Sequence, residues 1–496
     1  MRILLVEPRT PDTFWTMRPA VRFLGRRAAN PPLGLLTVAG LLPRHWDLRL
    51  VDLNCSELHD ADILWADRVL VSAMQIHRQE VVRLVERCHA LGRTVMGGGP
   101  LFTTVPAAPG QPVDNAGVDH VVVGEAEELA GQLVADLEAG RPRPLYVAPG
   151  FPDLALTPQP RWDLLDLSSY ATMSVQSCRG CPFDCEFCDV VALNGRRPRY
   201  KSPEQFVAEL ETLRRLGWRS PVFVVDDNFV GDRRRCRGLL EALIEWRRRT
   251  RTRITFLTEA SVDMAAHPDL LELMVAAGFK KVFLGLETPS AASLRECHKL
   301  QNLRGDLATA VRTIQAAGIE VMGGFIVGFD SDEPDIFERQ FEFIQRTGVV
   351  TAMVGLLQAL PHSRLYARLA KEGRLRGPGS GDNTKAFLNF EPRLDREFLL
   401  ENYRRLMTRL YEPGTYYQRI RVFLENHRAR GPRTHVGWRD IRALVSSMWV
   451  IGVVSRGRRA YWHFLVTTLV RHPRQIGVAV TLAIMGHHYR AVAAGL

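Results

Sequence analysis

The chain has 496 residues, of which 46% are hydrophobic, and its formal net charge is +11. This length suits about two to four domains, and the hydrophobic fraction excludes an intrinsically disordered chain. Four of the eight cysteines lie in one short segment, which excludes a disulfide framework. The arginine-rich helices come without a helix-turn-helix, a finger or a basic aromatic strand, so a nucleic-acid partner is not expected.

Residues 1–140 alternate between strand and helix patterns. Strands are predicted at 2–6, 48–52, 68–73, 94–96 and 119–123, and helices at about 33–43 and 80–91. This alternation indicates a parallel sheet covered on both faces, whose ligands lie beyond the carboxyl ends of the strands. The loop at Ser72 and the glycines at 97–99 are therefore a candidate site. A tight strand–helix turn is the alternative explanation for the glycines.

Residues 141–165 are rich in proline, which predicts an extended interdomain linker without helix or sheet. Residues 166–375 then resume the alternation, with strands predicted at 172–176, 222–226, 254–259, 281–287, 320–328 and 351–358. Six parallel units form an incomplete (β/α) barrel, in which active groups gather at the carboxyl ends of strands. Residues 376–496 are predicted to be a mostly helical C-terminal extension.

Three cysteines follow the first barrel strand directly. Cys181, Cys185 and Cys188 are separated by three and then two residues, a spacing that suits iron–sulfur or zinc chemistry. In a four-iron cluster, three thiolates leave one iron without a protein ligand, and an open metal position binds a substrate or cofactor. A closed site that includes Cys178 and reactive thiols without metal are the two alternatives.

The segment Cys181-x3-Cys185-x2-Cys188, with Phe187 before its last cysteine, resembles the signature of radical S-adenosylmethionine (SAM) enzymes. The resemblance implies a [4Fe-4S] cluster on the three cysteines, whose open iron binds SAM. It also implies an external one-electron reductant, whose electron cleaves SAM to a 5′-deoxyadenosyl radical. The SAM contacts implied by the family are Phe187, Asp227 for the methionine amino group, Glu287 for the ribose, and Gly324, Ile326 and Gly328 for adenine.

The region before the cysteines resembles the cobalamin-binding domain of a large radical SAM subgroup. Ser72-Ala73-Met74 and Gly97-Gly98 match later parts of the cobalamin fingerprint, and Gly124-Glu125-x-Glu127 recurs in the subgroup. The Asp-x-His-x-x-Gly element is absent, and His77 either faces cobalt or is a hydrogen-bonded histidine. The cobalamin contacts that this resemblance implies are Ser72, Met74, Gly97, Gly98, Gly99 and Glu125.

These resemblances imply an α/β protein with an N-terminal Rossmann-like cobalamin-binding domain, a partial (β/α)6 radical SAM barrel and a helical extension. The extension resembles that of a subset that includes hopanoid C-2 methyltransferases. The implied function is transfer of a methyl group to an unactivated carbon of a small-molecule or lipid-like substrate. The alternatives are cobalamin-dependent rearrangement, cyclisation or oxidation without methyl transfer, and a non-catalytic iron–sulfur protein.

The last residues, 441–496, combine apolar runs with arginines. No apolar run approaches the ~20 residues that span a bilayer, and the opening residues lack a secretory signal, so a cytoplasmic location is expected. An amphipathic basic tail suits peripheral contact with an anionic membrane. Helices that cap the barrel are the alternative interpretation.

Overall fold

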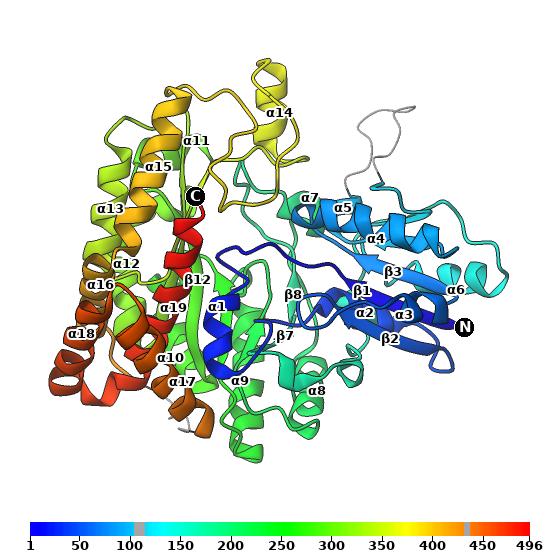
Figure 1. Ribbon diagram of the computed structural model, residues 1–496, viewed down its shortest axis with the longest axis horizontal. Coiled ribbons are helices and arrows are strands. Elements are labelled where there is room, and N and C mark those ends of the chain that lie inside the picture. Colours follow the sequence, from blue (N-terminus) through cyan, green and yellow to red (C-terminus); the bar gives the residue numbers. More distant parts are fainter. Residues whose placement is uncertain (104–114, 431–436) are drawn as a thin grey trace.

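The computed structural model describes residues 1–103, 115–430 and 437–496, without the side chain of residue 439. Two six-stranded sheets form two α/β bodies that lie side by side (Figure 1). All strand pairs in both sheets are parallel. The predicted α/β fold class is therefore confirmed, whereas the domain boundaries after residues 140, 165 and 375 stay predictions.

The first sheet has the strand order β2-β1-β3-β4-β5-β6. In β1, Ile3 and Leu5 pack against one group of helices and Leu4 and Val6 against another, so both faces are buried. The strands are β1 (Arg2–Glu7), β2 (Asp47–Asp52), β3 (Arg68–Ser72), β4 (Val95–Gly98), β5 (His120–Val123) and β6 (Leu145–Val147). The helices are α2 (Leu33–Leu41), α3 (Asp60–Trp65), α4 (Arg78–Ala90), α5 (Pro100–Thr103) and α6 (Ala130–Glu138).

The proline-rich stretch differs from its prediction at one point. Leu145–Val147 is strand β6, which pairs in parallel with β5 at the edge of the first sheet. Prolines 144 and 149 flank this strand instead of interrupting it, and proline is tolerated at sheet edges. The remainder of the stretch contains only short 3₁₀ turns, at Leu154–Leu156 and Trp162–Leu164.

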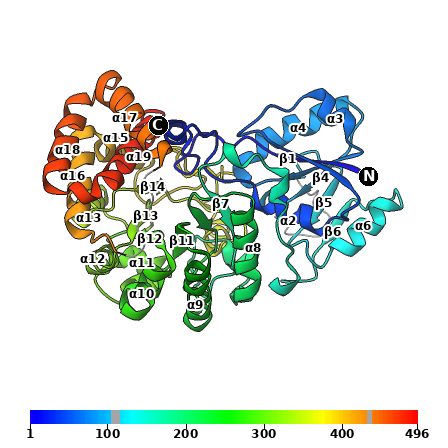
Figure 2. The same ribbon diagram turned by 90° about the horizontal axis from the view of Figure 1, so that it is seen from below.

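The second sheet has the order β14-β13-β12-β11-β10-β7 and curves into an incomplete barrel with helices outside it (Figure 2). Its strands are β7 (Met173–Val175), β10 (Val222–Val224), β11 (Phe256–Ala260), β12 (Phe279–Glu287), β13 (Glu320–Val327) and β14 (Ala352–Leu356). The helices between and after them are α8 (Pro203–Arg215), α9 (Arg233–Thr250), α10 (Pro268–Ala277), α11 (Ala291–Glu296), α12 (Leu307–Ala317), α13 (Ile336–Thr347) and α14 (Arg364–Lys371).

The C-terminal helices cover the β14 edge of this sheet. They are α15 (Arg396–Tyr411), α16 (Pro413–Asn426), α17 (Trp438–Trp449), α18 (Arg458–Arg471) and α19 (Ile476–Ala494). The hydroxyls of Tyr403 and Tyr411 on α15 donate to the carbonyls of Val354 and Ala352 in β14. These bonds satisfy acceptors that an edge strand otherwise leaves open. Across the described residues, none of the helices combines the length and the hydropathy needed to cross a membrane.

A segment near the N-terminus leaves the first sheet and packs on the barrel body. Phe14 lies against Tyr489 of α19 with ring centroids 6.0 Å apart, and Trp15 lies against Phe283 of β12 at 4.9 Å. The short helix α1 (Arg18–Val21) continues this contact beside α19 (Figure 1). This crossing cannot be predicted from the sequence, because no local pattern indicates which distant helix a loop will contact.

Candidate functional site

The three cysteines lie in the loop between β8 (Cys178–Arg179) and α7 (Val190–Asn194), just beyond the carboxyl end of β7. β8 pairs antiparallel with β9 (Arg199–Tyr200), so a small hairpin holds the base of this cysteine loop. Gly180 has φ +99°, and a Cβ there would lie 2.9–3.0 Å from three backbone carbonyl oxygens. Only glycine fits this entry to the loop.

All three thiols are free and partly exposed, whereas Cys178 is fully buried. Burial raises the pKa of the Cys181 thiol and raises that of Cys188 to about 12. Within the described ranges, no group of three His, Cys, Asp or Glu side chains converges on a single metal ion. A four-iron cluster does not require such convergence, because each thiolate binds a different iron. Three accessible soft donors in one loop fit the predicted cluster, and their ligand role stays a prediction.

Two adjacent carboxylates after β10 hold the cysteine loop. Asp226 accepts hydrogen bonds from the backbone N–H groups of Ser177 and Cys178, at 2.7 and 3.0 Å. Asp227 accepts from the Gly180 N–H at 2.7 Å and from the Asn194 amide at 2.9 Å. Burial raises the pKa of both carboxyls, that of Asp226 to about 6. Asp227, predicted to contact SAM, thus has partners in the loop itself.

Glu287 ends β12 with its carboxylate beside a buried lysine. Its backbone has φ +62°, a left-handed conformation that is strained for a glutamate, and its Oε1 lies 2.8 Å from Nζ of Lys299. Lys299 Nζ also lies 5.8 Å from the ring centroid of Phe187. Burial alone would lower the pKa of Lys299, but Glu287, Cys185 and Cys188 together raise it. Lys299 therefore remains a cation between the cysteine loop and Glu287.

The predicted adenine contacts lie on β13 and differ in exposure. Gly324 and Ile326 are partly exposed on the face directed into the open barrel, with buried residues on either side of each. Gly328 follows the strand with φ +103°, and its N–H donates to Asp332 at 2.8 Å. Gly324 and Ile326 are thus accessible to a ligand, whereas the N–H of Gly328 already has a partner.

At the carboxyl edge of the first sheet, the predicted cobalamin contacts divide into two groups. A Cβ on Gly97 would lie 2.5 Å from the ring of Phe102, and one on Gly99 would lie 2.8 Å from Ser72 Oγ. Close packing and a tight turn therefore explain these two glycines. Gly98 has no neighbour closer than 3.8 Å to such a Cβ, and the side chain of Met74 is 50% exposed. Gly98 and Met74 leave room for a flat ligand on this edge.

Glu125 connects the two bodies. Arg179, two residues before Cys181, forms ion pairs with Glu125 and, at 2.8 Å, with Glu127, and Arg199 also pairs with Glu125. All four side chains are at most 16% exposed. Burial raises the pKa of Glu127, but Arg179 outweighs this and the net shift is downward. We call these four residues the interdomain clamp.

His77 is hydrogen-bonded within the first body. Its Nε2 lies 3.0 Å from Thr10 Oγ1, and its Nδ1 accepts from the backbone N–H of Met74 at 3.3 Å. The side chain is buried, which lowers its pKa to about 4. Both ring nitrogens have protein partners, which matches the hydrogen-bonded alternative and disfavours a cobalt ligand.

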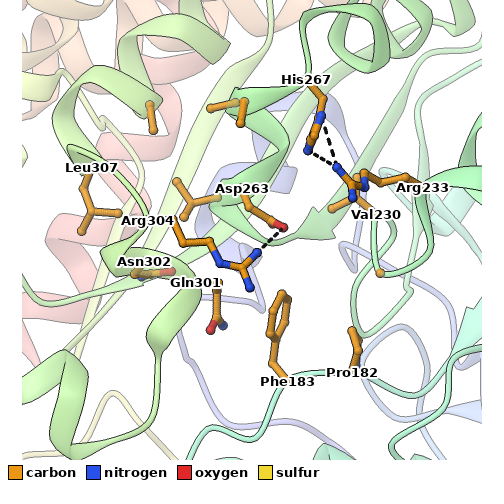
Figure 3. Close-up of a pocket in the computed structure, with 16 residues that line it drawn as sticks. Pro182, Phe183, Val230, Arg233, Asp263, His267, Gln301, Asn302, Arg304 and Leu307 are labelled. Carbon is orange, nitrogen blue, oxygen red and sulfur yellow. Dashed lines mark hydrogen bonds and ion pairs between the residues drawn. The ribbon is translucent and has the colours of Figure 1, made fainter.

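A cavity of about 350 Å³ lies on the flank of the cysteine loop (Figure 3). Pro182 and Phe183, between the first two cysteines, form one wall, and Gln301 and Asn302 form another. Gln301 reaches Cys185 Sγ at 3.7 Å, so the cavity extends to the surroundings of this thiol. Arg233 and Arg304 lie on its other walls (Figure 3).

Lys299, Gln301 and Arg179 were missed by the sequence reasoning. Arg179 lies beside the cysteine motif, which was a usable signal, but its partners are more than fifty residues away in sequence. Lys299 and Gln301 lie in a turn without a recognisable pattern.

Three protein-family models match three successive segments of the chain. The B12 binding domain covers residues 26–134, the radical SAM superfamily covers 175–344, and a domain of unknown function (DUF4070) covers 363–495. The first of these matches lies within the first α/β body and includes β2 to β5, and the second lies within the barrel and includes β10 to β13.

The chain is also similar to whole methyltransferases. It is 39% identical to an uncharacterized methyltransferase of Synechocystis sp., over 99% of this chain and 91% of that protein. It is 34% identical to the hopanoid C-2 methylase of Rhodopseudomonas palustris, over 98% of this chain and 92% of that protein.

Solved structures share the fold at low identity. TsrM from Kitasatospora setae, a radical SAM methyltransferase with cobalamin and a [4Fe-4S] cluster bound, gives a TM-score of 0.56 at 16% identity, covering 75% of this chain and 78% of TsrM. The cobalamin-dependent radical enzyme OxsB gives 0.61 at 15% identity, covering 100% of this chain and 81% of OxsB.

A cofactor-binding α/β body beside a barrel with a three-cysteine loop defines an enzyme that brings two cofactor sites together. The chain belongs to the family of cobalamin-binding radical SAM methyltransferases. Its cofactors are cobalamin, a [4Fe-4S] cluster and SAM.

Proposed function

We propose that the enzyme methylates an unactivated carbon of a small, lipid-like molecule. The observation that carries this proposal is the similarity to the hopanoid C-2 methylase, which extends over 98% of this chain, including the C-terminal helices. The barrel interior agrees with an apolar substrate, since Phe283, Trp15 and Ile326 are only partly buried in it. Peripheral membrane contact, also expected from the sequence, would suit such a substrate.

When bound, the cluster and SAM supply a 5′-deoxyadenosyl radical that removes a substrate hydrogen, and cobalamin supplies the methyl group. Cys181, Cys185 and Cys188 would hold the cluster, and Asp227 keeps their loop in place through Gly180 and Asn194. Gly324, Ile326 and Phe187 would line the SAM pocket, with Gly328 at its rim. Glu287 would receive the ribose hydroxyls and is oriented by Lys299.

On the cobalamin side, Gly98 and Met74 would face the ring, with Ser72, Gly97 and Gly99 shaping the edge behind them. Glu125, predicted to contact cobalamin, has its carboxylate engaged by Arg179 and Arg199. We therefore propose that Glu125 fixes the distance between the cobalamin site and the SAM site.

We also propose that the external one-electron reductant approaches the flank of the cysteine loop. The cavity there reaches Pro182, Phe183 and, through Gln301, Cys185. Arg233 and Arg304 on its walls favour a negatively charged donor. Replacing both arginines with glutamate should slow reduction by an acidic electron-transfer protein, measured by stopped-flow absorbance, without slowing reduction by dithionite.

Methyl transfer is tested with SAM that carries a deuterated methyl group. Anaerobic protein, supplied with a low-potential reductant and a hopanoid, should yield a hopanoid with the label bound to carbon, detected by mass spectrometry. Release of 5′-deoxyadenosine without a labelled product would instead support rearrangement, cyclisation or oxidation. Binding of a cluster without any SAM cleavage would support a non-catalytic iron–sulfur protein.

Two cysteine variants form a matched pair for this assay. Cys188→Ala should abolish both the cluster absorbance and the product, because an iron loses its ligand. Cys178→Ala should retain both, since the Cys178 thiol is buried at 3.9 Å from the carbonyl of Asn228, apart from the partly exposed trio. Loss of the cluster in Cys178→Ala would support the closed four-cysteine site.

A further inference from the structure

The outer surface of α17 carries an apolar stripe that no described residue covers. Trp438, Ile441, Val445 and Trp449 recur every three or four residues, so they lie along one side of the helix. Trp438 is 79% exposed and Trp449 is 63% exposed. The opposite side packs inward, with Ala443 and Ser447 buried. α17 therefore packs against protein on its inner side, whereas its apolar outer side is left exposed by the described residues.

A second stripe continues on α18. Trp462, Val466, Leu469 and Val470 lie on its outer side, and Val470 is 75% exposed. On its inner side, Phe464 stacks on Tyr417 of α16 with ring centroids 4.8 Å apart. The hydroxyl oxygen of Tyr461 lies 2.8 Å from Oγ of Ser447 on α17, within hydrogen-bond distance. α18 thus covers the barrel body with one side and directs apolar side chains outward with the other.

The two stripes adjoin through the π-helical turn Val450–Val454 that follows α17. Val453 and Val454 are exposed in this turn, and the indole N–H of Trp462 donates to the carbonyl of Gly452 at 2.8 Å. We call the outer sides of α17, the turn and α18 the outer face. Within the outer face, α18 lies on the side of the barrel body farthest from the first sheet (Figure 2), whereas α17 packs beside the N-terminal segment at Arg22–Leu24. Exposed apolar patches of this extent mark interaction sites.

The charged residues around the outer face are almost all basic. Residues 437–496 contain eight arginines and a single acidic residue, Asp440, which caps its own helix by accepting from the N–H of Gly437 at 2.7 Å. Arg456 precedes α18, Arg458 and Arg459 are its first two residues, and Arg471 and Arg474 follow its apolar stripe. All five are exposed, and none pairs with an acidic side chain of the described residues. Apolar side chains with tryptophans, bordered by arginines, fit the interface of an anionic lipid bilayer.

We propose that the outer face docks the enzyme on the surface of an anionic membrane. Its tryptophans and aliphatic side chains enter the interface between headgroups and acyl chains, and its arginines contact the lipid phosphates. A second copy of this chain is a poorer occupant, because two such basic faces repel each other. The purpose of docking rests on the proposed function, since a membrane-bound enzyme can receive a lipid-like substrate directly. Binding itself needs no turnover.

The test is sedimentation of the full-length holoprotein with vesicles of phosphatidylcholine alone or with added phosphatidylglycerol. The wild type should sediment with the anionic vesicles and at least about tenfold less with the neutral ones, with a blue shift of tryptophan fluorescence on binding. The double variant Trp449→Glu/Val470→Glu should bind at least about tenfold more weakly. So should the triple variant Arg456→Gln/Arg458→Gln/Arg459→Gln.

Matched variants on other elements act as controls. Leu64→Glu/Leu156→Glu introduces the same charges at exposed apolar sites of the first body and linker, and Arg83→Gln/Arg215→Gln/Arg248→Gln removes exposed arginines elsewhere. Both should bind vesicles like the wild type. Cleavage of SAM, measured without vesicles, should be unchanged in every variant, which separates failure of docking from failure of the proposed function.

Wild-type protein that sediments with neither vesicle would overturn the proposal, as would an equal loss of binding in the controls. A dimer in sedimentation velocity that Trp449→Glu dissociates, without vesicle binding by the wild type, would assign the outer face to a second copy instead.

Discussion

At the scale of single residues, Lys299 places a positive charge between the carboxylate of Glu287 and the thiols of Cys185 and Cys188. The sequence offered no sign of this arrangement, because a lysine in a turn is ordinarily a solvated surface residue. Here its ammonium is hydrogen-bonded and its side chain is only 15% exposed. Such a charge stabilises negative charge on neighbouring sulfurs.

Lys299→Met should lower the reduction potential of the cluster by on the order of tens of millivolts, because a reduced cluster is the more negative form and loses a nearby cation. Redox titration followed by electron paramagnetic resonance measures this shift. Lys299→Arg keeps the charge and is the control. An unchanged potential in Lys299→Met would show that the charge is too well screened to influence the cluster.

The carboxyl of Glu259, at the end of β11, has a pKa raised to about 7 by burial and by Asp227 and Asp226. The folded protein therefore binds this proton more tightly than the unfolded chain does. The raised pKa of Glu259 therefore adds to the free energy of unfolding. This contribution is complete below about pH 4.5, is lost as the pH rises through about 7, and is on the order of 3 kcal/mol.

Glu259→Gln removes this titration. Relative to the variant, the wild type should lose free energy of unfolding between about pH 5 and pH 8, measured by urea denaturation without added SAM. Glu272→Gln, at an exposed position on α10, should follow the wild type at both pH values. Parallel pH profiles for the wild type and Glu259→Gln would contradict the raised pKa.

At the scale of elements, α15 completes a sheet that does not close on itself. Tyr411 and Tyr403 donate to carbonyls of β14, and the guanidinium of Arg419 on α16 donates to the carbonyl of Val350 just before that strand. An open barrel of six strands has two edges, β14 and β7, and side chains from the C-terminal helices supply hydrogen-bond donors at the β14 edge. The helical extension is thus part of the barrel's structure.

Tyr411→Phe should lower the free energy of unfolding by about 1–3 kcal/mol, because the carbonyl of Ala352 then remains buried without a donor. Urea denaturation monitored by far-ultraviolet circular dichroism measures the change. The control is Tyr366→Phe, since the Tyr366 hydroxyl has no hydrogen-bond partner among the described residues and its loss should cost much less. Equal effects would show that the Tyr411 bond contributes nothing.

Most elements could be predicted from the sequence, and the exceptions have a common cause. The strands of both sheets carry apolar runs because each face is buried, a requirement visible within a few residues, as in Ile3 to Val6. The spacing of the three cysteines predicts an iron–sulfur or zinc site, and the resemblance to the radical SAM signature implies a [4Fe-4S] cluster. Leu145–Val147 was hidden by neighbouring prolines, and the partners of Glu125 and Glu287 depend on contacts between segments far apart in sequence. A single sequence does not encode such pairings in a local pattern.

At the scale of the whole molecule, the interdomain clamp fixes the two bodies against each other. Arg179 belongs to the base of the cysteine loop, and Glu125 and Glu127 follow the last central strand of the first sheet. Removing one partner from a buried ion pair costs about 3–5 kcal/mol, because the remaining charge stays desolvated. The clamp therefore ties the base of the cysteine loop to the carboxyl edge of the first sheet.

Arg179→Gln should accelerate proteolysis within the proline-rich stretch and reduce methyl transfer more than it reduces cleavage of SAM, because the cofactor sites lose their fixed separation. Limited proteolysis and the ratio of labelled product to 5′-deoxyadenosine measure these effects. Arg196→Gln, which removes one partner of the exposed Asp184, is the control and should cost less than about 1 kcal/mol. A proportional loss of both activities would show that Arg179 supports only the cysteine loop.

The crossing segment that carries Phe14, Trp15 and Phe23 also affects how this chain can be divided. A fragment ending in the proline-rich stretch would keep the first sheet but would expose these three rings, and the remaining fragment would leave Tyr489 and Phe283 without their aromatic partners. If the first α/β body were replaced by that of a relative, α19 would need matching substitutions. The two bodies can therefore be combined in a chimaera only when the aromatic residues of the crossing segment match those of the barrel body.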